Sequence, residues 1–150
     1  ASDVYKRQVL KNKERNLSST NKKYLKKFLK PKVHQSLGMH LRGIATSCID
    51  VSDGLIGDLG HICKLSRVGA KLYYASIPYE GNFQDALTWG DDYELCFTVP
   101  KNKLQRILEI EKALKIKLFK IGEIVKENKI RVFNEETELF FKKNSYNHFS

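Results

Sequence analysis

The sequence predicts an α+β domain in which a mixed β-sheet packs against helices. The chain has 150 residues, which is enough for one ordinary globular domain. Its helical and strand-like segments are mixed along the chain rather than strictly alternating, which argues against a purely parallel sheet. The strand-like segments 119–125 and 130–133 flank a turn at Glu127 and Asn128, and we expect these two strands to pair as a hairpin.

The N-terminal quarter of the sequence divides into a polar lead and two short helices. Residues 1–18 are polar and aperiodic, and we interpret them as a linker or a cloning scar that precedes a domain over residues 19–150. We expect one helix over 19–29, which Pro31 terminates, and a second over 37–45.

The middle of the sequence predicts a strand, a tight turn and a helix. A short strand over 47–51 is followed by a turn, and Asp53 is the expected N-cap of a helix over 54–66. Gly69 is the expected end of that helix. Apolar residues at helical spacing predict its buried face: Leu55, Ile56, Leu59, Ile62, Cys63 and Leu65.

The second half of the sequence predicts two more strands and two more helices. We expect a strand over 70–77, a short helix over 83–88 and an alternating strand over 93–99. An amphipathic helix is expected over 101–114 because its apolar residues recur at helical spacing: Leu104, Ile107, Leu108 and Leu114.

The composition is that of a folded protein and indicates a cytoplasmic location. Hydrophobic residues make up 41% and charged residues 29%, no apolar run approaches the roughly 20 residues of a membrane helix, and the first residues are too polar for a secretory signal. The three cysteines, Cys48, Cys63 and Cys96, lie in apolar contexts at wide spacings. We expect them to be buried, reduced thiols.

The net charge of +10 belongs to the N-terminal stretch. Residues 1–42 contain 12 Lys and Arg against 2 Asp and Glu, whereas residues 43–150 contain 15 of each. Such a block can bind nucleic acid. We favour a solvated helix face, because Tyr24 and Phe28 have the spacing of one packed helix face and aromatic residues do not interleave with the lysines.

Two carboxylates and a hydroxyl converge where the predicted strand meets the predicted helix. Asp50 and Ser52 share one side of the strand, and Asp53 stands at the start of the helix. Magnesium prefers such hard oxygen ligands, and free N–H groups at a helix N-terminus favour phosphate. The alternative is that Ser52, Asp53 and Gly54 form an ordinary turn. Asp50 fits that alternative less well, since a carboxylate at the end of a buried strand is costly.

Other polar residues give weaker signals. Asp91, Asp92 and Glu94 precede or begin a strand and either face a ligand or form an Asx turn. His61 follows Asp58 by about one helical turn, which suits either a metal pair or helix packing. The sequence contains no P-loop and no C-x-x-C motif.

Two long motifs, with three shorter matches, resemble the thiamine-monophosphate kinase family. The first motif, at 48–55, continues into 58–62, and the second spans 90–100. The shorter matches are 69–70, 121–124 and 146–149. The resemblance covers roughly residues 19–150, and it implies the fold of the C-terminal domain of aminoimidazole ribonucleotide synthetase-like proteins.

The resemblance implies transfer of a phosphoryl group from ATP to thiamine monophosphate, assisted by magnesium ions. By motif match, Asp50 and Asp53 would be magnesium ligands, Ser52 would contact ATP, and Asp91 and Tyr146 would contact the substrate. No residue is implied as a catalytic acid, base or nucleophile, since catalysis in such a site rests on positioning and charge neutralisation.

The sequence also departs from the family pattern. The family usually has Glu at the position of Asp91 and Gly at the position of Ser145. Its N-terminal domain, which carries most of the magnesium-binding acids and the dimer interface, is absent, and we therefore expect this chain to be inactive alone. A sister ATP-dependent synthetase of the same superfamily and a basic nucleic-acid-binding module are the alternatives.

Overall fold

The computed structural model describes residues 34–79, 83–88 and 94–140. The helix expected over 19–29, Asp91, Asp92 and Tyr146 lie outside the described residues. The elements follow in the order α3 (Gln35–Leu41), β1 (Ser47–Asp50), α4 (Leu55–Ser66), β2 (Gly69–Tyr73), 3₁₀ helix η1 (Tyr74–Ser76), α5 (Phe83–Thr88), β3 (Leu95–Thr98), 3₁₀ helix η2 (Lys101–Lys103), α6 (Leu104–Leu114), β4 (Gly122–Val125), β5 (Ile130–Asn134) and β6 (Thr137–Leu139).

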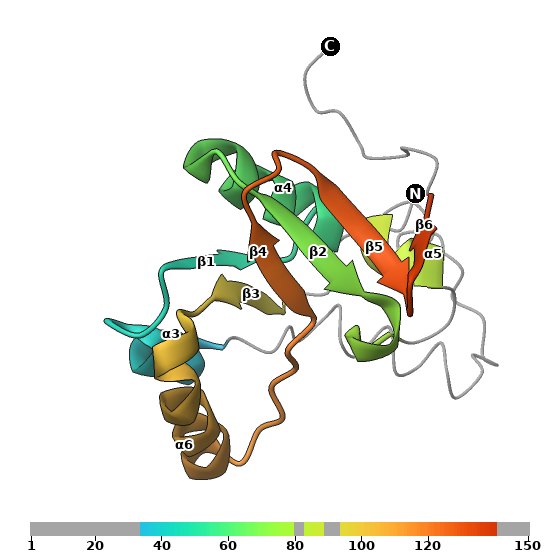
Figure 1. The fold of residues 1–150 in the computed structure, drawn as a ribbon. Helices are drawn as coiled ribbons and strands as arrows, with labels where there is room; N and C mark the ends of the chain where they lie inside the picture. Colours follow the sequence, from blue (N-terminus) through green and yellow to red (C-terminus); the bar gives the residue numbers. More distant parts are fainter. Residues whose placement is uncertain (1–33, 80–82, 89–93, 141–150) are drawn as a thin grey trace, which may run out of the picture.

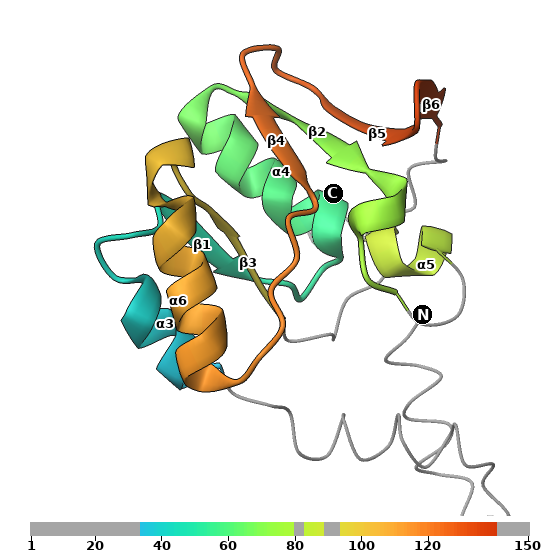
Figure 2. The same ribbon diagram turned by 60° about the horizontal axis from the view of Figure 1, so that its bottom comes forward.

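The strands form two sheets. β1 and β3 pair antiparallel, and the other four strands form a mixed sheet in the order β4-β2-β5-β6. α4 lies against one face of the mixed sheet, while α3 and α6 lie side by side next to the β1–β3 pair (Figures 1 and 2). The predicted α+β class with a mixed sheet is confirmed.

The expected hairpin between the strands on either side of Glu127 is wrong. β2 lies between them, antiparallel to β4 and parallel to β5. Residues 126–129 therefore cross over the start of β2, where Ala70 N donates a hydrogen bond to Lys129 O at 3.0 Å. Ala70 and Leu72 are each only 2% exposed. The most buried strand thus takes the centre of the sheet, with a neighbour on each side.

Gly69 does not end α4, as the sequence suggested. Arg67 ends the helix in the left-handed conformation with φ 54°, and its N–H bonds to the carbonyl oxygens of Cys63 and Lys64. Gly69 is instead the first residue of β2. A Cβ atom there would collide with the carbonyl oxygens of Glu127 and Lys129. The glycine is required by the close passage of the 126–129 crossover.

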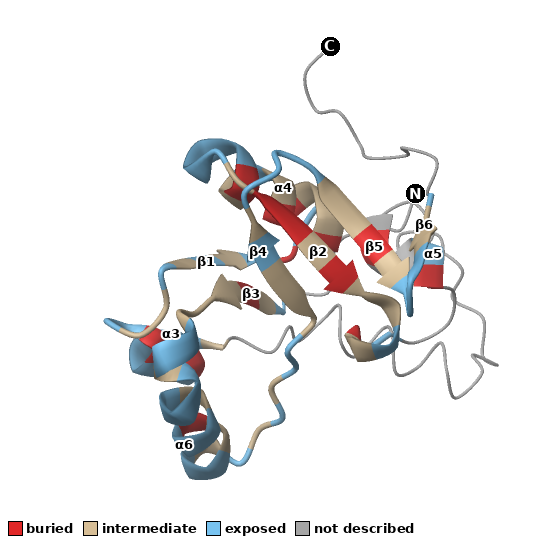
Figure 3. Cartoon of the chain, in the orientation of Figure 1, coloured by how far each residue is buried: buried red, intermediate tan, exposed pale blue. Residues whose placement is uncertain are grey.

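The main hydrophobic core lies between α4 and the mixed sheet (Figure 3). Leu55, Leu59 and Cys63 recur every four residues along α4 and are buried, as a single helix stripe requires. Leu65 is 87% exposed, so its expected place in that stripe is wrong. A second cluster is formed by Leu37 and Leu41 of α3 and Ile110 of α6.

β3 connects the two clusters because its side chains alternate between two faces. Cys96 belongs to the main core, whereas Leu95 and Phe97 pack against the second cluster. The β1–β3 pair is thereby fixed from both sides. This placement matters for function because β1 leads directly into the motif that contains Asp50, Ser52 and Asp53.

Candidate functional site

The turn between β1 and α4 presents the predicted site residues at the surface. Val51 is buried and anchors the turn in the main core, while Asp50, Ser52 and Asp53 are exposed. Asp50 does not lie at the end of a fully buried strand, so its expected desolvation cost is absent. An exposed carboxylate at this position is open to a ligand.

Asp53 does not cap α4. The N-cap is Gly54, with φ 94° and ψ 150° and no side-chain cap. Residues other than glycine rarely adopt this conformation. The backbone reversal before α4 therefore depends on Gly54, and the Asp53 carboxylate is left available for other contacts.

The buried carboxylate of Asp58 forms hydrogen bonds with the backbone of the turn. Its Oδ2 atom accepts hydrogen bonds from Ser52 N at 2.8 Å and Asp53 N at 2.9 Å. Asp58 is 3% exposed and is the one buried charged side chain among the described residues. The sequence placed Asp58 in the first motif, but the only role considered for its side chain was as a metal partner of His61, which is exposed. The signal it missed is an acid beside Leu55 and Leu59 in the apolar stripe of a helix.

These hydrogen bonds alter the expected chemistry of the turn. The sequence suggested that free backbone N–H groups would face a phosphate beside Asp50 and Asp53. Two of those groups, on Ser52 and Asp53, are already bonded to Asp58. Asp58 also places a negative charge in the first turn of α4, where it interacts favourably with the helix dipole. The turn therefore offers chiefly side-chain oxygens.

Strand pairing places Glu94 and Leu95 of the second motif beside the first motif. Asp50 is opposite Leu95, and Val51 N donates to Glu94 O at 2.8 Å. Glu94 Oε2 lies 3.0 Å from Nε2 of His34, close enough for an ion pair but without hydrogen-bond geometry. The polar stretch that ends at Glu94 thus joins the sheet at the level of the Asp50 turn.

The described donors suit part of a magnesium site. Asp50 and Asp53 form no ion pair with any other described residue, so both carboxylates are available. No group of three or more His, Cys, Asp and Glu side chains within the described ranges could hold a metal. Magnesium usually keeps several waters and is bound by one or two carboxylates together with substrate phosphates, so two exposed acids fit it as an incomplete protein site.

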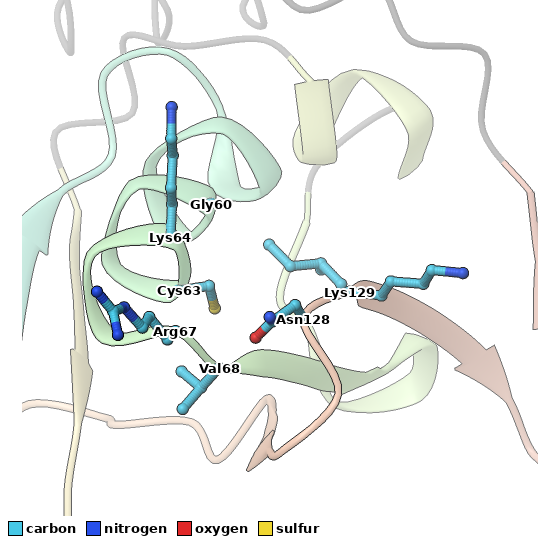
Figure 4. A pocket seen from close by; sticks show the side chains of 8 residues that line it. Gly60, Cys63, Lys64, Arg67, Val68, Asn128 and Lys129 are labelled. Atoms are coloured by element: carbon cyan, nitrogen blue, oxygen red, sulfur yellow. The ribbon is translucent and has the colours of Figure 1, made fainter.

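A cavity of about 320 Å³ lies at the opposite end of α4. Cys63, Val68, Asn128 and Ile130 contribute to its lining, and the charged ends of Lys64, Arg67 and Lys129 point in different directions (Figure 4). The cavity therefore lacks a convergent set of charges. Gly60 is the first α4 residue that lines the cavity, so the cavity begins about 8 Å along the helix axis from Leu55.

The three cysteines are free thiols but differ in exposure. Cys63 and Cys96 are buried as expected, whereas Cys48 is exposed, so its expected burial is wrong. Partial burial, followed by the negative charge of Asp50, raises the pKa of Cys48. Burial is also the main cause that raises the pKa of Cys96 to about 11.

We expect a thiol reagent at pH 8 to modify only Cys48 in the folded protein. The rate should rise about tenfold per pH unit below the raised pKa, because the thiolate is the reactive form. Mass spectrometry of labelled peptides measures each site, and Cys48→Ser should remove the fast reaction. Labelling of Cys96 before unfolding would contradict this expectation.

Comparison with known protein families gives a match over most of the chain. The sequence model of the family "AIR synthase related protein, C-terminal domain" matches residues 5–134. The chain belongs to this family.

None of the described helices has the length and apolar content needed to cross a bilayer.

Several relatives of this AIR synthase-related domain are thiamine-monophosphate kinases. The enzyme of Buchnera aphidicola subsp. Schizaphis graminum is 40% identical across 83% of this chain and 42% of the relative. The crystal structure of the Stenotrophomonas maltophilia K279a enzyme has a TM-score of 0.69 and 33% identity, covering 78% of this chain and 40% of that one. The resemblance drawn from the sequence is confirmed.

A further solved structure extends the likeness in fold. AaThiL complexed with AMPPCP and TMP has a TM-score of 0.72 at 22% identity and covers 96% of this chain and 47% of that one. The present chain spans about two fifths of the length of the curated relative from Buchnera. The domain described here therefore corresponds to one part of those proteins.

Proposed function

We propose that this chain supplies part of the active site of an ATP-dependent thiamine-monophosphate kinase, which forms thiamine diphosphate. The observation that carries the proposal is the pairing of β1 with β3, which joins the two family-like motifs at Val51 and Glu94. Relatives named thiamine-monophosphate kinase support the reaction. The AaThiL fold accommodates both AMPPCP and TMP, which supports ATP as co-substrate.

In this proposal the Asp50 turn binds the metal–nucleotide complex. Asp50 and Asp53 ligate magnesium, and the Ser52 hydroxyl contacts ATP. Magnesium, when bound, neutralises the charge that develops on the transferred phosphoryl group. The protein residues bind and orient this complex, and none of them needs to act as an acid or a base. Two observations support the assignment: the three residues are exposed, and neither carboxylate forms an ion pair with another residue that the structure describes.

Asp91 and Tyr146 are proposed to contact thiamine monophosphate. Both lie outside the described residues, so the proposal for them rests on motif position. Asp91 precedes Glu94 by three residues, which limits its distance from the β1–β3 pair to about 10 Å of extended chain. Asp91 is one methylene shorter than the Glu of the family pattern, and we expect a weaker or water-mediated substrate contact.

The site in this chain is proposed to be one half of a complete site. Two available carboxylates form an incomplete donor set for several magnesium ions, and the chain spans 42% of its Buchnera relative. We propose that an N-terminal domain supplies the remaining acids and a homodimer interface, and that this chain alone is inactive. The three free cysteines support a cytoplasmic location.

A chimera tests the proposed function. This chain replaces the matching segment of the thiamine-monophosphate kinase from Buchnera aphidicola subsp. Schizaphis graminum, and ATP consumption is measured in a coupled assay. We expect turnover that requires both magnesium and thiamine monophosphate in the chimera, and none in the 150-residue chain alone.

The controls separate folding from function. Circular dichroism and size-exclusion chromatography establish that the chimera is folded, and the unaltered Buchnera enzyme sets the reference rate. A folded chimera without activity would overturn the proposed kinase function. Activity of the isolated chain would overturn the half-site proposal alone. ATP turnover with another substrate but not with thiamine monophosphate would favour a sister synthetase.

A further inference from the structure

We infer that Asp58 is the positioning residue of the Asp50 turn, and that this turn binds its ligand through side chains rather than through the N–H groups of Ser52 and Asp53. The inference rests on the proposed function, because it assigns a role within the same site. Its foundation is the pair of hydrogen bonds from those two N–H groups to Asp58 Oδ2, at 2.8 and 2.9 Å.

The hydrogen bonds fix the position of Ser52 and Asp53, whose side chains are the proposed ligand-binding groups, relative to α4. A single carboxylate oxygen accepts both N–H groups, and hydrogen bonds to an ionised acceptor are among the strongest in proteins. Asp58 is on the first turn of α4, where its own N–H bonds to Gly54 O at 3.0 Å. Asp58 therefore connects the turn to the helix through its side chain, which bonds to Ser52 and Asp53, and through its backbone N–H, which bonds to Gly54.

The location of Asp58 suits a supporting role rather than direct ligand binding. Its side chain is 3% exposed, and it lies beside Leu55 and Leu59 in the main core. Ser52 and Asp53, by contrast, are exposed. Orientation of metal ligands by hydrogen bonds from a supporting layer of residues is a general requirement for tight binding.

The same geometry restricts how a phosphate group can bind. A phosphate cradle made of backbone N–H groups needs those donors to point at the ligand. Here the donors of Ser52 and Asp53 point at a buried carboxylate, whose negative charge also repels an anion. We therefore expect inorganic phosphate without a divalent cation to leave the Ser52 and Asp53 amide signals unchanged in NMR spectra of the 150-residue chain.

The first arm of the test measures the backbone directly in the 150-residue chain. Amide hydrogen exchange is recorded for the unaltered chain, Asp58→Ala, Asp58→Asn and Glu111→Ala. Glu111 is the matched control, since its carboxylate also accepts a backbone N–H bond, from Leu118 at 2.9 Å, but lies on α6. We expect the largest increase in exchange at Ser52 and Asp53 in Asp58→Ala, a smaller increase in Asp58→Asn, whose amide oxygen can still accept, and none in Glu111→Ala.

The second arm measures activity in the chimera described above. We expect Asp58→Ala to lower kcat by about tenfold or more, the range found for residues that orient metal ligands, and to raise the magnesium concentration needed for half-maximal rate. Glu111→Ala should stay within about twofold of the unaltered chimera even where it lowers thermal stability equally. Asp58→Asn should restore part of the lost kcat.

The outcomes distinguish the inference from the function on which it rests. An active chimera in which Asp58→Ala keeps the unaltered kcat and magnesium dependence would overturn the inference and leave the kinase proposal standing. Unchanged exchange at Ser52 and Asp53 in Asp58→Ala, or their perturbation by metal-free phosphate, would likewise overturn it. A folded but inactive unaltered chimera would overturn the kinase proposal and this inference together.

Discussion

Replacement of Gly69 by alanine is expected to destabilise the fold by about 3 kcal/mol or more, the upper part of the range for overpacking a close-packed site. The added Cβ atom would meet the backbone carbonyl oxygens of Glu127 and Lys129 and the backbone nitrogen of Lys129. Backbone atoms cannot rotate away as the end of a flexible side chain can. The crossover at 126–129 would have to shift, and the adjoining pairs of β2 with β4 and β5 would shift with it.

Gly38→Ala is the matched control for that substitution. Gly38 is exposed in α3, and a Cβ atom there would meet nothing within 4 Å. Alanine should therefore stabilise the protein by about 0.5–1 kcal/mol through helix propensity. Chemical denaturation of both variants gives the free energies of unfolding. Equal stability of Gly69→Ala and the unaltered protein would disprove the close crossover.

Replacement of Asp53 or Asp50 by asparagine is expected to lower the kcat of the chimera by about 100-fold or more, while stability changes little. Loss of a charged magnesium ligand removes several kcal/mol of transition-state stabilisation, and each 1.36 kcal/mol is a factor of ten in rate. Stability should be preserved because both carboxylates are exposed and form no ion pair with another described residue.

Glu109→Gln supplies the control for the loss of an exposed carboxylate. Glu109 lies on α6 and pairs with Arg106 at the surface, at 3.3 Å, and such exposed pairs contribute little. Steady-state rates over a magnesium titration compare the three variants. Should Asp50→Asn and Asp53→Asn both match Glu109→Gln in rate and magnesium dependence, the assignment of these two residues as ligands is wrong.

Local sequence patterns predicted the elements that depend on short-range spacing. The strand at Ser47–Asp50, the helix at Leu55–Ser66 and the short helix at Phe83–Thr88 are present where the sequence placed them. Each is specified by an apolar repeat and by nearby turn or helix-ending residues, which act over a few positions. The candidate site residues Asp50, Ser52 and Asp53 were found for the same reason, since they occupy one short turn.

Contacts between distant segments were not predicted. The Glu127-Asn128 turn suggested a hairpin, because adjacent strands with a short connection commonly pair. The energy gained by burying Ala70 and Leu72 and by pairing β2 along both edges overrode that preference. Likewise, α4 ends at Arg67 rather than at Gly69. Gly69 instead leaves room for the backbone of the 126–129 crossover. The position of β2 and the role of Gly69 have no local signature, since both depend on contacts with residues about 60 positions away.

The sequence by itself determined the fold class, the strand–turn–helix unit and the acidic side chains of the candidate site, because periodicity and turn chemistry are local properties. The tertiary structure alone decided how that turn is held. In the folded protein Asp58 is buried, and its carboxylate accepts hydrogen bonds from two backbone N–H groups of the turn. Strand pairing places Glu94 beside Val51. The physical reason is that a buried charge must find hydrogen-bond donors, and only the packed fold determines which donors are within reach.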